Sequence, residues 1–164
     1  MKKMFIAFMA IAALVAVSCS KDEEKTENTS IEGRWDAPRF ADNPEDIAFV
    51  AIFGKDNLDL YVIPWGQHME GTYTYSNGMV HYDITAAYQA YTDVSYNDNG
   101  DMISRSWNAG NLDAATLTLS EGFDWYEMPV DEYRQEFGDF EFKINGNTAT
   151  STLVGIPDLT FYKK

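Results

Sequence analysis

Hydrophobic and polar residues alternate along most of the chain after residue 30. In one example, Val80, Tyr82 and Ile84 alternate with polar side chains. The same pattern recurs in residues 58–63, 72–75, 80–85, 116–119, 140–144 and 159–162. A period of two is typical of a strand in an antiparallel sheet that buries one of its faces. We therefore predict a strand in each of these segments.

Turn-forming residues separate the alternating segments. The Asn-Gly pairs at positions 77–78 and 145–146 are strong signals for β-hairpins. Parallel strands need helical crossovers, and the sequence predicts no long helix. We expect about eight to ten antiparallel strands in one all-β domain, arranged as a sandwich or a barrel. An up-and-down barrel is favoured because closure removes exposed sheet edges. Residues 122–137 give the weakest pattern, and we expect a helical turn or a lid at 132–137.

The first thirty residues have a different character. Lys2 and Lys3 precede an uncharged, mostly apolar run over residues 4–17. About 7–15 apolar residues suit a signal peptide, whereas a spanning helix needs roughly 18 or more. Residues 20–30 contain no apolar side chain. The sequence therefore predicts a signal peptide at 1–18, a flexible acidic tether at 19–30 and a folded domain at 31–164.

Residues 16–19, Ala-Val-Ser-Cys, resemble the lipobox of bacterial lipoproteins. The resemblance implies that Cys19 is lipidated, becomes the new N-terminus and anchors the chain in a membrane. The alternative is an ordinary cleavage that leaves a free thiol. Residues 20–24 are similar to the acidic export tag of Bacteroidetes lipoproteins, which implies a lipid anchor in the outer membrane and exposure at the cell surface. A solvated acidic linker is the alternative for this segment.

The folded domain opens with Gly33-Arg34-Trp35. This resembles the Gly-x-Trp element of lipocalins and related calycins. The resemblance implies a lipocalin-like barrel in which Gly33 permits a bend and Trp35 closes one end. In many lipocalins an arginine stacks on this tryptophan, and Arg105 and Arg134 are the possible equivalents. Residues 71–80 also look like the middle hairpin of small lipocalin-like lipoproteins of Bacteroidetes.

Charge and cysteine content narrow the function classes. The chain has 12 basic and 26 acidic residues. Without Lys2 and Lys3 the formal charge is −16, which argues against nucleic acid as a partner. It also argues against electrostatic docking on anionic lipid. One cysteine excludes a disulfide framework. The oligomeric state does not follow from these features.

Candidate chemistry is sparse. His68 and Glu70 form a His-x-Glu pair, but a zinc site needs three or four ligands, and we interpret His68 as a loop residue. His81 is expected on the exterior of a strand. The oxygen-rich segment 97–101 has its glycine too early for an EF-hand. No nucleophile elbow is present. We expect no metal site, no cofactor and no enzymatic activity.

Aromatic residues are the most informative remaining feature. They make up 15% of the chain, and several stand near predicted strand ends or on inward-facing positions. Flat amphipathic rings at a barrel mouth suit an apolar ligand or stack on sugars. We predict that the barrel binds a small hydrophobic or amphipathic ligand, with an envelope-interaction or glycan-binding scaffold as the alternative. The predicted binding residues are Trp65, Tyr73, Tyr75, Tyr82, Trp107 and Trp125.

Overall fold

The computed structural model describes residues 30–164, so the predicted leader, Cys19 and the tether up to residue 29 lie outside the described residues. Its elements are β1 (Gly33–Phe40), β2 (Asn43–Phe53), β3 (Asn57–Val62), the 3-10 turn η1 (Ile63–Trp65), β4 (Gln67–Ser76), β5 (Met79–Tyr96), β6 (Met102–Ser106), β7 (Asp124–Glu127), α1 (Val130–Phe137), β8 (Asp139–Asn145), β9 (Thr148–Ser151), the 3-10 turn η2 (Leu153–Gly155) and β10 (Leu159–Lys163). Within this range, no helix has both the length and the apolar character that crossing a bilayer requires.

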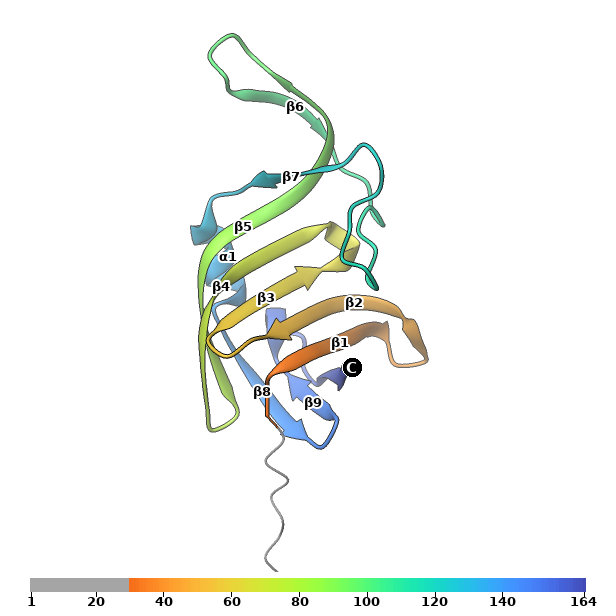
Figure 1. Cartoon of the computed structure of the whole chain (residues 1–164), viewed down its shortest axis with the longest axis vertical. Helices are drawn as coiled ribbons and strands as arrows, with labels where there is room; N and C mark the ends of the chain where they lie inside the picture. Colours follow the sequence, from red (N-terminus) through yellow and green to blue (C-terminus); the bar gives the residue numbers. More distant parts are fainter. Residues whose placement is uncertain (1–29) are drawn as a thin grey trace, which may run out of the picture.

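Eight of the ten strands close into an antiparallel barrel (Figure 1). They pair in the order β4-β3-β2-β1-β10-β9-β8-β5, and β5 pairs back with β4. Neighbouring strands of the barrel are also consecutive along the chain, except that β1 pairs with β10 and that β6 and β7, which lie outside the barrel, come between β5 and β8. This confirms the predicted all-β, up-and-down barrel. The two additional strands, β6 and β7, both pair with β5, whose 18 residues extend beyond the barrel.

Inward-facing side chains pack the barrel interior. Val80, Tyr82 and Ile84 are all buried, as their alternation predicts. The ring of Phe142 lies at the centre of an aromatic cluster, with its centroid 5.3 Å from Trp35 and 5.2 Å from Phe53. Close-packed rings of this kind contribute burial of large apolar surfaces and favourable edge contacts. This half of the barrel is therefore filled by side chains.

Residues 122–137 form β7 and α1. The expected single turn or lid is an eight-residue helix. Tyr133 and Phe137 lie four positions apart, hence on one helix face, and both are buried in the barrel core. Asp131 in the first turn and Arg134 in the last complement the helix dipole. The helix is therefore a packed part of the domain.

The predicted strand at 116–119 is wrong. Asp113 Oδ1 accepts hydrogen bonds from the amides of Ala115 and Thr116, each at 2.8 Å. This side-chain to backbone pattern makes a turn, and Leu117 then adopts a φ of 57°, which a strand does not allow. The alternation of Thr and Leu here belongs to a loop.

That loop, residues 107–123, packs on the outer face of the barrel. Leu112 forms a buried cluster with Val50 of β2 and Ile63 of η1. Arg34 of β1 donates hydrogen bonds to the carbonyls of Ala114 and Ala115. The loop is thus attached to the barrel wall by both apolar and polar contacts.

Candidate functional site

At one end of the barrel, which we call the closed end, Trp35 packs among the aromatic rings of the core. The Trp35 side chain is fully buried, and its Nε1 donates a hydrogen bond to the carbonyl of Ile31 at 2.7 Å. Gly33 has a φ of 116°, a conformation that residues with a side chain rarely adopt. Trp35 is therefore part of the core, and Gly33 stands at a backbone position suited to glycine.

The cation over Trp35 is a lysine. Lys163 Nζ lies 5.3 Å from the ring centroid of Trp35. The expectation of an arginine at this place is wrong, because Arg105 lies over the Tyr91 ring and Arg134 donates to the carbonyl of Ile84. Lys163 reaches Trp35 because β10 pairs with β1 in a register that places the two residues opposite each other.

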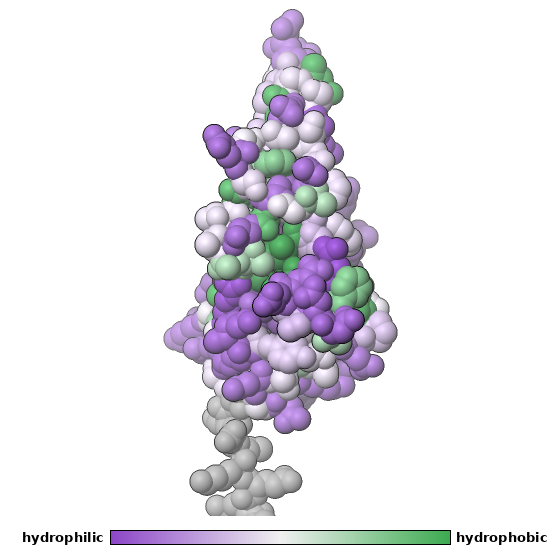
Figure 2. Space-filling view, turned by 90° about the vertical axis from the view of Figure 1, so that its right-hand side faces the viewer, coloured by the Kyte–Doolittle hydropathy of each residue, from purple (hydrophilic) through white to green (hydrophobic). Residues whose placement is uncertain are grey.

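The opposite end of the barrel is open and holds an apolar pocket of about 500 Å³. It lies where β1 and β3 end and β2 begins. Figure 2 faces this side of the molecule and shows hydrophobic surface in a central hollow bordered by hydrophilic residues. The pocket is lined by Arg39, Ala48, Phe49, Val62, Pro64, Trp65, Trp107, Ala109, Glu136, Val154 and Ile156. Its floor is part of the core, since Phe49 and Val62 are buried.

Two tryptophans form one side of this pocket. Trp65 follows Pro64 in η1, which ends at Gly66 in the left-handed conformation (φ 57°). Trp107 Nε1 donates a hydrogen bond to the carbonyl of Trp65 at 2.8 Å, across a separation of 42 residues. Both side chains remain 46% exposed. Tryptophans that are held in place yet exposed at a cavity mouth are suited to contact a ligand.

The same two tryptophans also border a second, smaller pocket of about 290 Å³. Its other lining residues are Gln67, Gln89 and Tyr91. The amide nitrogen of Gln89 donates to the carbonyls of Trp65 and Gly66. Within residues 30–164, the buried Gln67 Oε1 has no hydrogen-bond partner. A buried acceptor without a donor is costly, so a donor brought to this oxygen would be stabilising.

The structure brings together only part of the predicted binding residues. Trp65 and Trp107 meet at the open end. Tyr73, Tyr75 and Tyr82 lie toward the closed end, and each hydroxyl donates to a backbone carbonyl. Burial raises the pKa of all three phenols. These hydroxyls are engaged with the backbone, and Tyr73 and Tyr82 also line a separate cleft between β4, β5 and α1.

Trp125 lies on the outer face of the barrel. It packs with the apolar cluster beneath loop 107–123 and near the ring of His68, 5.8 Å away. Its neighbour on β7, Tyr126, approaches Tyr91 instead. Trp125 therefore takes no part in the mouth pocket.

Sequence reasoning missed the floor and the polar edge of the pocket. Phe49 and Val62 look like ordinary core residues. Gln67 and Gln89 carry a usable signal, because each occupies the same strand face as inward-pointing residues such as Met69 and Ala87. A polar side chain at an inward position near a strand end marks a cavity.

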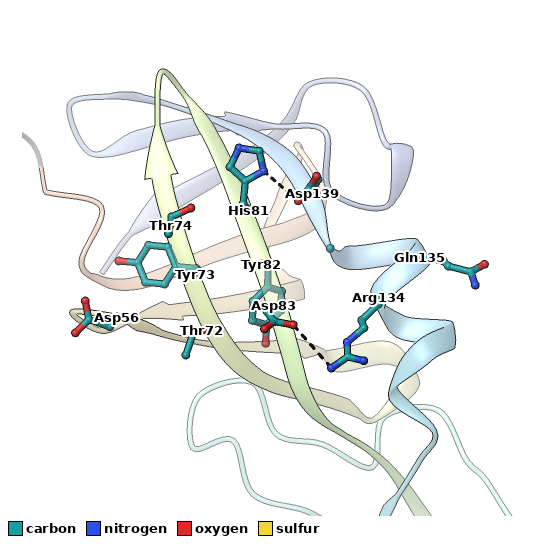
Figure 3. Close-up of a pocket in the computed structure, with 11 residues that line it drawn as sticks. Asp56, Thr72, Tyr73, Thr74, His81, Tyr82, Asp83, Arg134, Gln135 and Asp139 are labelled. Carbon is teal, nitrogen blue, oxygen red and sulfur yellow. Dashed lines mark hydrogen bonds and ion pairs between the residues drawn. The ribbon is translucent and has the colours of Figure 1, made fainter.

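A larger cleft of about 730 Å³ lies between β4, β5 and α1 (Figure 3). Four of its charged side chains form two ion pairs, and Asp56 also lines it. His81 Nδ1 lies 3.2 Å from Asp139, and Arg134 lies 3.8 Å from Asp83. These side chains are largely exposed, and exposed ion pairs contribute little energy. We regard the apolar mouth pocket as the stronger candidate.

The chain matches no protein-family model, no curated protein and no solved structure. The site must therefore be interpreted from its own geometry.

Proposed function

We propose that this chain is a surface-anchored lipoprotein whose barrel mouth binds a small amphipathic ligand without chemical conversion. The observation that carries the proposal is the apolar pocket of about 500 Å³ bounded by Trp65 and Trp107. Small-molecule sites commonly span roughly 300–1,000 Å³ and combine apolar walls with a few polar groups. The ligand would sit at the mouth, because side chains fill the closed half of the barrel.

The two pockets at the Trp pair support an amphipathic rather than a purely apolar ligand. The apolar pocket would take a hydrocarbon portion against Phe49 and Val62. The smaller pocket, lined by Gln67, Gln89 and Tyr91, is more polar and would take a polar head group. Trp65 and Trp107 belong to both linings, so one ligand can contact both.

The non-enzymatic part of the proposal rests on the side chains present. Neither lining contains a serine, a cysteine or a histidine. The titratable side chains of the apolar pocket are Arg39 and Glu136, and those groups line its polar rim. Acid–base or nucleophilic catalysis usually needs groups with matched pKa values in one site.

A homologous series of alkyl glucosides tests ligand binding, measured by isothermal titration calorimetry with purified protein below the micelle concentration. Each buried methylene contributes about 0.8 kcal/mol, so Kd should fall about fourfold per added methylene until the pocket is full. Trp65→Ala and Trp107→Ala should each raise Kd at least about tenfold. Trp125→Ala is the matched control and should leave Kd unchanged.

Binding that is absent across the series, or lost equally in Trp125→Ala, would refute a mouth site. Glycan binding is the second candidate, because Trp65, Trp107 and the two glutamine amides combine stacking surfaces with hydrogen-bond donors and acceptors. Glycan binding predicts that oligosaccharides without an alkyl chain bind as tightly as the alkyl glucosides. It also predicts that the Kd of the glucosides does not depend on the length of their alkyl chain.

The proposed anchor is tested separately. Cells grown with labelled palmitate should incorporate label into the wild-type chain and not into Cys19→Ala. Protease applied to intact cells should digest the wild-type protein if it is exposed at the surface. An unlabelled wild-type chain would exclude lipidation.

A further inference from the structure

On the outer face of the barrel, a histidine lies between two carboxylates. His68 Nε2 is 3.3 Å from Asp59 Oδ1, and His68 Nδ1 is 3.7 Å from Glu70 Oε1. One donor atom from each of the three residues lies within 4.8 Å of the others. The group is separate from the mouth pocket, because Gln67 and Met69, the neighbours of His68, belong to the opposite face of β4.

Strand pairing fixes this arrangement. Asp59 on β3 stands directly opposite Glu70 on β4, and His68 stands opposite Tyr61. Residues two apart on a strand share a face, so all four side chains emerge from the same side of the sheet. Asn57 Nδ2 also donates to Asp59 Oδ2 at 3.4 Å, which turns the other oxygen toward His68. Such hydrogen bonds behind a ligand are characteristic of built metal sites.

The imidazole is held in an aromatic sandwich. It stacks on Tyr61 with a centroid distance of 4.1 Å and an interplanar angle of 3°, and Tyr88 lies 5.7 Å away. The His68 side chain is only 11% exposed. A ring fixed in this way loses little conformational entropy when it coordinates an ion.

The charge of the cluster favours a cation. Among residues 30–164, the ion pairs of Asp59 and Glu70 involve His68 and no lysine or arginine. The two carboxylates face each other across the β3–β4 pair, beside a histidine side chain that is only 11% exposed.

We infer that Asp59, His68 and Glu70 form a binding site for a divalent transition-metal ion, with Zn²⁺ as the best fit. Zinc accepts one imidazole and two carboxylates and leaves a fourth position for water or another ligand. Donors at about 2.1 Å from a tetrahedral Zn²⁺ lie roughly 3.4 Å apart, close to the 3.3 Å between Asp59 and His68. The Glu70 side chain is 45% exposed and can rotate to complete the set.

Calorimetric titration of the purified protein with ZnCl₂ tests this inference, using protein first treated with a chelator and then freed of it. We expect one Zn²⁺ per chain. Asp59→Asn and Glu70→Gln should each raise Kd at least about tenfold, and His68→Asn should raise it more. The two carboxylate variants keep side-chain shape, so they decide the question even if His68→Asn is unstable.

His81→Gln supplies the matched control. His81 also pairs with a carboxylate, that of Asp139, but both side chains are exposed, and no second carboxylate of residues 30–164 pairs with His81. It should bind Zn²⁺ as the wild type does. Equal loss in His81→Gln, no saturable one-to-one binding, or wild-type affinity in all three cluster variants would overturn the inference. Glucoside binding should be unchanged in Asp59→Asn, so failure of this site and failure of the mouth site are distinguishable.

Discussion

Replacing Trp35 by phenylalanine tests the energetics of the closed end. The substitution removes the indole N–H that donates to the carbonyl of Ile31 at 2.7 Å. Because both residues are buried, an acceptor left without a donor costs about 1–3 kcal/mol. The smaller ring leaves a void of about 40 Å³, which adds about 1 kcal/mol at roughly 24 cal/mol per Å³. The edge contact with Phe142 is largely retained, so we expect a loss of about 2–4 kcal/mol.

Urea denaturation followed by circular dichroism measures this loss. The midpoint should fall while the slope stays unchanged, as expected when stability alone changes. Trp125→Phe is the matched control, since this half-buried indole donates no hydrogen bond within residues 30–164, and it should cost less than about 1 kcal/mol. A Trp35→Phe protein within about 0.5 kcal/mol of the wild type, or equal to the control, would refute the reasoning.

Three further predictions concern other parts of the barrel. Gly71→Ala should destabilise the protein by about 1–3 kcal/mol in the same assay, because a Cβ there would overlap the backbone carbonyl of Asp83 at the β4–β5 bulge. Arg34→Ala should speed proteolysis within loop 107–123, because it removes the hydrogen bonds to Ala114 and Ala115; unchanged cleavage would count against this attachment. Tyr61 has an ordinary pKa of 10.0 when unfolded and about 12 when folded, so the native state retains its proton longer and stability should fall between about pH 10 and 12. In urea titrations, Tyr61→Phe should lose less stability over that range than the wild type.

The fold could be predicted from the sequence because one face of each barrel strand is buried. The alternation in residues 80–85 correctly gives the inward set on β5, and five of the six alternating segments lie almost entirely in strands. The alternation does not predict the structure at 116–119, because Asp113 accepts hydrogen bonds from two backbone amides of a turn and Leu117 has a positive φ. Local turn chemistry there outweighs the strand preference of the Thr-Leu repeat.

The candidate sites could be predicted only in part, because they depend on contacts between distant segments. The sequence marks Trp65 and Trp107 as candidate binding residues. Only the fold brings them together, through the hydrogen bond from the Trp107 indole to the Trp65 carbonyl. The pair formed by His68 and Glu70 can be recognised in the sequence. The third ligand, Asp59, comes from the preceding strand, and the β3–β4 register brings it into place. His68 itself lies on β4, so its interpretation as a loop residue was wrong.

The central claim is that the mouth of the barrel binds an amphipathic ligand beside the two exposed tryptophans. A ¹⁵N-correlation spectrum of the four indole N–H groups, recorded during titration with an alkyl glucoside, tests it most directly. The signals of Trp65 and Trp107 should shift and saturate together, while that of the buried Trp35 should stay in place. Saturating shifts confined to Trp35 or Trp125, or no shift in any indole signal, would contradict the account.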